Sequence, residues 1–139
     1  MIIGLDGVTS QDTDVSAGRD MTIKTGNDTD NSNIFIYGNV QGKGAASLTT
    51  KKGTIAVLGD VTSGSGDLLM ASTVEGDIIN KGVLSSSGAN VQLTTTKGSI
   101  WHKKDITAAK DVILDSQADL EQTGNIESGG STSLNSQGK

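Results

Sequence analysis

His102 is the only histidine of the chain, and its neighbours make it the first candidate for catalysis. Ser99 precedes it by three residues and Asp105 follows it by three. A hydroxyl, an imidazole and a carboxylate are the groups of nucleophilic acyl transfer when a fold brings them together. However, Ser99 and Asp105 occupy turn positions of an internal repeat, which Thr54 and Asp60 fill in another copy. We therefore predict no catalytic residue and expect that the chain is not an enzyme.

Asp28 and Asp30 are the candidates for a metal site. With Ser32 they give the alternating oxygen ligands that open a calcium loop of the EF-hand type. An EF-hand would then need Gly at 33 and Glu at 39, where Asn33 and Asn39 stand. A calcium-binding β-roll would need a nine-residue repeat, and the repeats of this chain are 20–25 residues long. A solvated polar loop is therefore the favoured interpretation, and we expect no metal.

The charged residues argue against two further kinds of site. Glycan cleavage needs carboxylates gathered on one face, whereas most Asp residues here lie at predicted turns and Arg19 is the only arginine. The lysines are scattered, although a nucleic-acid groove needs clustered positive charge. The formal net charge is −5, with 13 Asp and 3 Glu, and it follows in part from turn chemistry. We predict no nucleic-acid partner and no cofactor.

The elements that would position these residues belong to a repeat. Each copy centres on a large aliphatic residue in a run of alternating character, which we call the first anchor. First anchors fall at 23, 48, 70, 93, 114 and 134, so that successive steps are 25, 22, 23, 21 and 20 residues. A period of this length is the signature of a solenoid, in which each coil buries its apolar face against its neighbours.

Two further anchors recur in every period. The second is Ile or Val at 15, 40, 61, 83, 106 and 126, and the third is Ile or Leu at 34, 55, 78, 100 and 120. Gly, Asn or Asp precede most anchors, and these residues favour turns because Gly accepts positive φ and Asn or Asp can bond its own backbone. Three short strands and three corners per copy predict an all-β fold, a triangular parallel β-helix of about six coils.

Strand alternation assigns side chains to the inside or the outside of the coils. The last inward position of the first strand is always Ser or Thr, and a hydroxyl there can bond another hydroxyl or a turn carbonyl. Two residues after the second anchor the chain has Ala, Gly or Ser, as a tight corner demands. By the same parity His102 points inward, in a polar stretch with Asn80 and Gln122.

The same alternation turns one apolar position outward on successive coils. It follows the third anchor and is occupied by Phe35, Ala56, Ile79 and Trp101, and then by Glu121. Aligned apolar residues on a surface often mark a contact, so Phe35, Ile79 and Trp101 form a candidate interaction surface. The competing interpretation is that the loop insertion predicted at residues 26–33 folds over part of this stripe.

Composition supports a thin core. The 139 residues include 19 Gly, no Pro and no Cys, and only 2% are aromatic, whereas a compact globule normally buries more large side chains. The 33% hydrophobic share raises disorder as an alternative, but disorder does not explain anchors in phase. No stretch reaches the roughly twenty apolar residues that span a bilayer. The N-terminus lacks a signal-peptide pattern, so an exported protein would contain this chain as an internal piece.

Several short motifs recur in phase with the repeat: Gly-Asp-Val-Thr-Ser at 59–63, Lys-Gly-Ser-Ile at 97–100, Ala-Lys-Asp-Val-Ile-Leu at 109–114 and Gly-Asn-Ile-Glu-Ser at 124–128. These motifs resemble the haemagglutinin repeats of filamentous haemagglutinin-like exoproteins. This two-partner-secretion family includes adhesins and the CdiA-type stalks of contact-dependent inhibition. The resemblance implies a right-handed β-helix on the surface of a Gram-negative bacterium, exported by an outer-membrane partner. The family's secretion domain carries an Asn-Pro motif, which a chain without proline cannot contain.

These observations predict one β-helical segment over residues 1–139, part of a longer repeat shaft. We expect a non-enzymatic scaffold in adhesion or contact-dependent inhibition, with the flanking coils of the parent protein as its first partners. A host or bacterial cell-surface receptor or a glycan is a further expected partner. The alternative is a carbohydrate-binding or glycan-processing β-helix.

Overall fold

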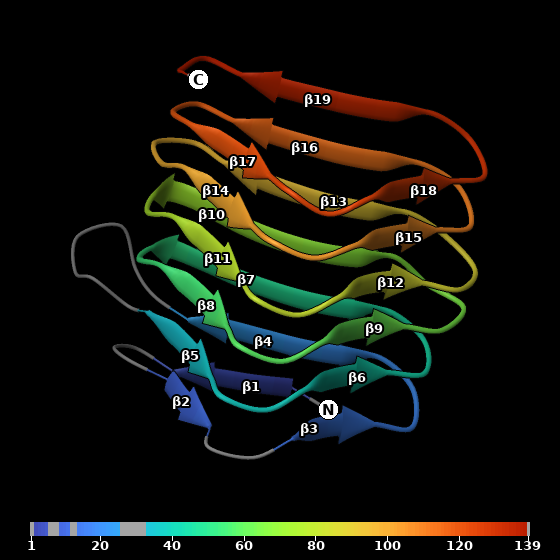
Figure 1. Ribbon diagram of the computed structural model, residues 1–139. Coiled ribbons are helices and arrows are strands. Elements are labelled where there is room, and N and C mark those ends of the chain that lie inside the picture. The colour runs from blue at the N-terminus through green and yellow to red at the C-terminus, as the bar shows by residue number, and fades with distance from the viewer. Residues whose placement is uncertain (1, 6–8, 12–13, 26–32, 139) are drawn as a thin grey trace.

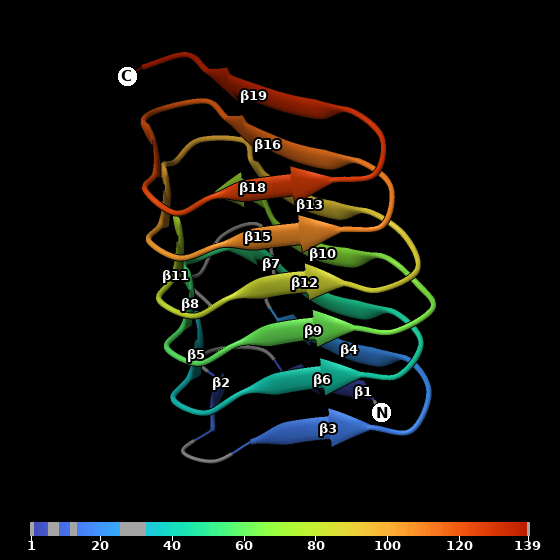
Figure 2. The same cartoon turned by 45° about the vertical axis from the view of Figure 1, so that its right-hand side comes forward.

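The protein is a right-handed parallel β-helix in the computed structural model, which describes residues 2–5, 9–11, 14–25 and 33–138 (Figure 1). The described residues form 19 strands in three parallel sheets and no helix. The chain runs along one sheet, turns a corner to the second and then to the third, and climbs one coil before it returns (Figures 1 and 2). The predicted three strands per coil are therefore confirmed. None of the described residues belongs to a helix long and apolar enough to cross a bilayer.

Each sheet collects one strand from every coil. Sheet A holds the longest strands: β1 (Ile2–Leu5), β4 (Met21–Thr25), β7 (Ala46–Lys52), β10 (Leu68–Glu75), β13 (Val91–Thr95), β16 (Val112–Ser116) and β19 (Thr132–Ser136). Sheet B contains β2 (Thr9–Gln11), β5 (Ile34–Ile36), β8 (Ile55–Val57), β11 (Ile78–Asn80), β14 (Ile100–His102) and β17 (Leu120–Gln122). Sheet C contains β3 (Val15–Ala17), β6 (Val40–Gly42), β9 (Val61–Ser63), β12 (Leu84–Ser86), β15 (Ile106–Ala108) and β18 (Ile126–Ser128).

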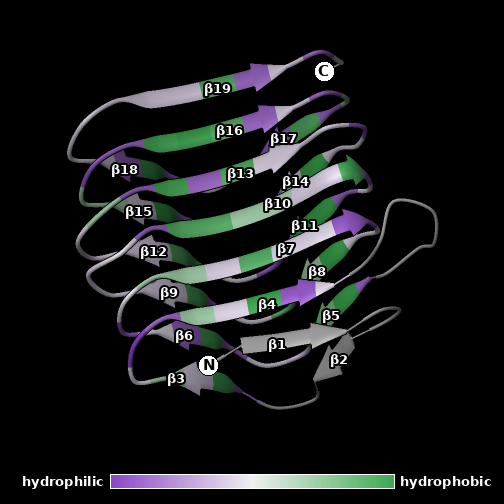
Figure 3. Cartoon of the chain, turned by 180° about the vertical axis from the view of Figure 1, so that it is seen from behind, coloured by the Kyte–Doolittle hydropathy of each residue, from purple (hydrophilic) through white to green (hydrophobic). Residues whose placement is uncertain are grey.

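The core is a column of aliphatic side chains stacked coil on coil. Strand pairing places the first anchors in register, from Ile23 through Leu48, Met70 and Leu93 to Leu114. All five side chains are fully buried, whereas the residues between the inward positions are half-buried or exposed, with the small Ala71 on β10 as the exception. Figure 3 shows this as bands of hydrophobic and hydrophilic colour along the strands of sheet A. Burial of apolar area is the main stabilising term of the fold, and here each coil supplies it to the next.

One anchor lies a residue away from its predicted position. The sequence pattern placed the second anchor of the fourth coil at Val83, but Leu84 pairs with Val61 and Ile106 and is fully buried. Val83 is half-buried and lies in the corner. The step from the third anchor, Ile78, to Leu84 is then six residues, as in the other coils. The inward small residue of this corner is consequently Ser86 rather than Ser85.

The inward hydroxyls at the ends of sheet A bond corner carbonyls. The Oγ1 atom of Thr95 donates to the Gly98 carbonyl over 2.7 Å. The Oγ atom of Ser116 donates to the carbonyls of Gly98 and Asp119, at 2.9 and 2.8 Å. A buried carbonyl left without a donor would be costly, so these hydroxyls allow the chain to turn between sheets without exposing the core.

Asp and Asn side chains bind the coils together at the corners. The Oδ1 atom of Asp67 accepts a hydrogen bond from the backbone N–H of Asn90 over 3.0 Å, and Oδ1 of Asn90 accepts one from Asp111 over 3.0 Å. Asp111 in turn accepts from Ser131 over 2.8 Å. The expectation that these residues bond their own turn is therefore wrong at this corner, because each side chain reaches the equivalent residue of the next coil. The spacing of the coils brings that N–H within reach of the carboxyl or amide oxygen.

Several glycines are required by the close approach of neighbouring corners. Gly76 has φ of +138°, a conformation that residues with a side chain rarely adopt. A Cβ atom at Gly82 would overlap the carbonyl oxygen of Gly59 in the coil below. At Gly82 a side chain is therefore excluded by the corner of the neighbouring coil and not by a positive φ.

Burial declines in the last coil. Leu120 and Ile126 are only partly buried against the core, and Leu134 is 52% exposed although it continues the column of first anchors. No described residue packs beyond β19, which forms the edge of sheet A. The predicted loop insertion at 26–33 lies outside the described residues except for Asn33, whose Oδ1 atom accepts from the N–H of Thr54 over 2.7 Å.

Substitution of Leu93 by Asp should unfold the protein. The carboxylate would lie between Met70 and Leu114 without a partner, and an uncompensated buried charge costs several kcal/mol, a large part of the about 5–15 kcal/mol that stabilises a domain. Circular dichroism during thermal unfolding measures the effect. Gln92→Asp is the matched control, since Gln92 is the outward neighbour on β13 and the same charge should there leave the fold intact. Equal melting temperatures for the two variants would contradict the inward assignment of Leu93.

Candidate functional site

His102 belongs to a polar ladder inside the coils. Asn80, His102 and Gln122 are paired in register on sheet B, which confirms the predicted inward polar stretch. The His102 ring is fully buried; its Nε2 atom lies 2.8 Å from the Gly82 carbonyl and its Nδ1 atom lies 2.5 Å from Oε1 of Gln122. Through these contacts the His102 ring links residues of neighbouring coils at the corner between sheets B and C.

The other two members of the ladder also bond corner carbonyls. The Nδ2 atom of Asn80 donates to the carbonyls of Val57 and Gly59, at 3.1 and 3.0 Å. The Nε2 atom of Gln122 donates to the carbonyl of Lys104 over 2.7 Å. The Oδ1 atom of Asn80 is buried without a hydrogen-bond partner among the described residues, a cost that the two donated bonds offset. The ladder therefore satisfies backbone groups that the corner turns inward.

The structure does not bring Ser99 and Asp105 to His102. The Oγ atom of Ser99 accepts from the backbone N–H of Asp119 over 3.2 Å, and Oδ1 of Asp105 accepts from the N–H of Asn125 over 2.9 Å. Both side chains thus act between coils, at two different corners of the triangle. The hydrogen-bond partners of His102 among the described residues are the Gly82 carbonyl and the Gln122 amide, neither of which is a nucleophile, so this geometry supports no acyl transfer through it.

The predicted outward stripe is aligned on the outer face of sheet B. Strand pairing places Phe35 beside Ala56, Ala56 beside Ile79, and Ile79 beside Trp101, with Glu121 next in the row. All five side chains are half-buried. Strands β5, β8, β11, β14 and β17 that carry them form one continuous face in Figure 1. The role of Phe35, Ile79 and Trp101 as an interaction surface remains a prediction.

A second column on this face was missed by the sequence analysis. Tyr37 is 55% exposed and Leu58 is 41% exposed, and they directly follow the inward residues of β5 and β8. The backbone ladder continues through this position, since the N–H of Leu58 donates to the carbonyl of Ile36 over 2.9 Å. Lys81 and Lys103 occupy the same position in later coils. The sequence does contain this column, as the residue that lies three positions after each third anchor.

Charges of both signs lie around these two columns. Six lysines lie at the corners on either side of sheet B or at the adjoining end of a sheet A strand: Lys51, Lys52, Lys81, Lys97, Lys103 and Lys104. Seven carboxylates lie at the same corners, at the end of a sheet A strand or on sheet B: Asp14, Asp60, Glu75, Asp77, Asp105, Asp119 and Glu121. Two pairs are within ion-pair distance, Lys52 with Glu75 at 3.9 Å and Lys103 with Glu121 at 3.8 Å. The formal charge of these described residues is therefore −1, so they present no positive field that would gather a polyanion.

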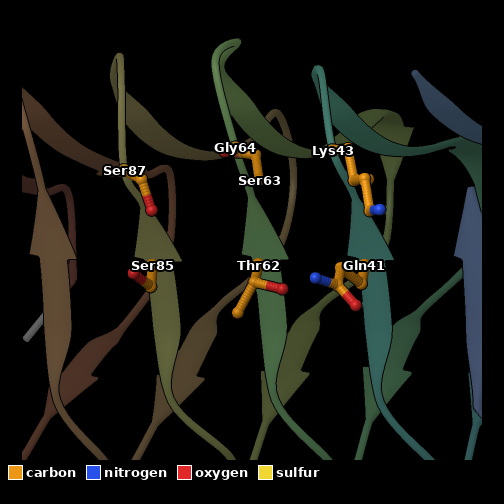
Figure 4. Close-up of a pocket in the computed structure, with 8 residues that line it drawn as sticks. Gln41, Lys43, Thr62, Ser63, Gly64, Ser85 and Ser87 are labelled. Carbon is orange, nitrogen blue, oxygen red and sulfur yellow. The ribbon is translucent and has the colours of Figure 1, made fainter. Parts of the chain in front are cut away.

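A shallow polar depression of about 500 Å³ lies on the outer side of sheet C (Figure 4). Gln41, Thr62 and Ser85 point outward from three successive strands, which pair in register. Lys43 and Ser87 line its edge toward sheet A. The depression is open to solvent, and the hydroxyl of Ser63, a buried polar residue in its lining, donates to the Gly66 carbonyl over 2.8 Å. It is therefore a weaker candidate than the face of sheet B.

No metal centre is formed by the residues that the structure describes. Among them no three His, Cys, Asp or Glu side chains gather to hold an ion. The metal candidates from the sequence, Asp28 and Asp30, lie outside the described residues.

Comparison of the chain with protein-family models, with curated protein sequences and with solved structures gave no match.

Proposed function

We propose that the chain is a non-enzymatic shaft segment of a secreted bacterial surface exoprotein, in which it holds adhesive or toxic parts away from the cell. A parallel β-helix suits this role because each added coil lengthens the rod without changing its cross-section. Aliphatic stacking and the Asp and Asn ladders oppose bending between coils. The haemagglutinin-like motifs support the bacterial surface and the two-partner export route.

The exposed end of the core is the observation that carries the proposal. Leu134 occupies a position that is fully buried in the five coils before it, yet it is 52% exposed. No strand among the described residues pairs with the outer edge of β19, and a sheet edge of this kind readily accepts another strand. We propose that a further coil of the same kind stacks here in the working protein, which makes flanking coils of the shaft the first partners of this segment.

Replacement of Leu134 by Asn tests the stacking. In the isolated chain Leu134→Asn should change the melting temperature little, because the side chain has few contacts to lose, whereas Leu114→Asn should lower it strongly. The same Leu134 variant should reduce concentration-dependent association, measured by light scattering, since an apolar end no longer has to be covered. Equal destabilisation by the two variants, or association that Leu134→Asn leaves unaltered, would contradict a stacking role for this end.

The surface location has its own test. Antibodies raised against the folded segment should label intact cells of the organism that encodes it, and protease added outside those cells should remove the label. A cytoplasmic protein serves as the control for cell integrity. Labelling that requires permeabilised cells would refute the proposed location, whatever the stacking experiment gives.

A further inference from the structure

We propose that the outer face of sheet B binds a neutral linear polysaccharide that lies along the axis of the rod. The binding surface consists of the stripe Phe35, Ala56, Ile79 and Trp101 and the adjoining exposed side chains of Tyr37 and Leu58. This inference does not depend on the shaft proposal, because a rod with or without flanking coils presents the same face.

The distribution of aromatic residues is the first argument. The chain has one Phe, one Tyr and one Trp, and all three lie on this outer face rather than in the core. Aromatic rings in a core would add much buried area, and their absence there makes their concentration on one surface informative. A flat ring offers a platform for the C–H face of a sugar, and the polar end of Tyr37 or Trp101 can hydrogen-bond to its hydroxyl groups.

The geometry of the face selects an extended ligand. Phe35 and Trp101 lie three coils apart, which is about 14 Å at a strand spacing of roughly 4.8 Å. Ile79 and Ala56 continue the apolar row between them, so the stripe is one residue wide and runs across the strands, with Tyr37 and Leu58 beside its first two members. Pyranose rings joined through equatorial bonds form a ribbon with apolar faces, and each ring advances by a distance similar to one coil.

The nearly balanced charges distinguish a sugar polymer from two other partners. The six lysines and seven carboxylates beside the stripe give no positive field, whereas single-stranded nucleic acid is held by a positively charged groove as well as by stacking. The centre of a protein interface is depleted in charge, but here charged side chains adjoin a narrow apolar row, as Lys103 and Glu121 do beside Trp101. Ammonium and carboxylate groups of both signs can donate to and accept from the rim of sugar hydroxyls.

Affinity electrophoresis together with the fluorescence of the only tryptophan tests the proposal. The native gels contain hydroxyethyl cellulose, xylan or glucomannan, with dextran and heparin as comparison polymers. At least one of the first three should retard the protein, and the same polymer in solution should shift Trp101 emission to shorter wavelength and protect it from iodide quenching. Retardation by none of the three, or by heparin alone, would overturn the proposal.

Matched variants locate the binding. Trp101→Ala should weaken retardation at least tenfold, and Trp101→Phe should retain most of the retardation of the unaltered protein. Tyr37→Ala should also weaken retardation, but it keeps Trp101 and therefore still shows the shift in emission when polymer binds. Gln92→Ala on sheet A is the control and should bind as the unaltered protein does. Each variant is first compared by its melting curve, so that a folding defect is recognised. Binding by folded Trp101→Ala and Tyr37→Ala at the original strength would show that this face is not the site.

Discussion

Coil-on-coil stacking is the interaction on which the rest of the structure depends. No single coil can bury its aliphatic residues, because three short strands around a triangle leave their apolar side chains open above and below. The column from Ile23 to Leu114 is fully buried because a paired strand lies on both sides of every member. Leu134 shows the consequence where that neighbour is missing, since it has the same position in the repeat and is 52% exposed.

The polar residues serve the same stacking. Asp67, Asn90 and Asp111 each accept an N–H of the following coil, so the corners repeat the register that the strands establish. Ser116 and Gln122 occupy the inside and bond the carbonyls that corners turn inward. These aspartates and His102 are residue types that often take part in catalysis. Here their side chains form hydrogen bonds between coils and at corners, so they serve the fold. The outer face of sheet B is different, since its aromatic side chains are not needed by the core.

The sequence was sufficient for the period, the three sheets and the inward positions, because these follow from local alternation. It was insufficient where contacts with the neighbouring coil determine which residue is buried or which group a side chain bonds. Val83 and Leu84 are both apolar, and only the six-residue step from Ile78, confirmed by pairing with Val61, selects Leu84. The Asp67 side chain was expected to bond its own turn, and its actual partner lies 23 residues away in the sequence. The exposure of Tyr37 does not follow from strand alternation, because Tyr37 lies beyond the end of β5, in the corner between sheets B and C.

Amide hydrogen exchange tests the central claim most directly, because it reports the stability of each backbone hydrogen bond. If stacking determines stability, protection should depend on the position of the coil: it should be greatest in the middle coils, from β8 to β13, should decline toward β18 and β19, and should be similar for the three sheets within one coil. Protection that is high throughout one sheet and low in the other two, irrespective of the coil, would contradict this account.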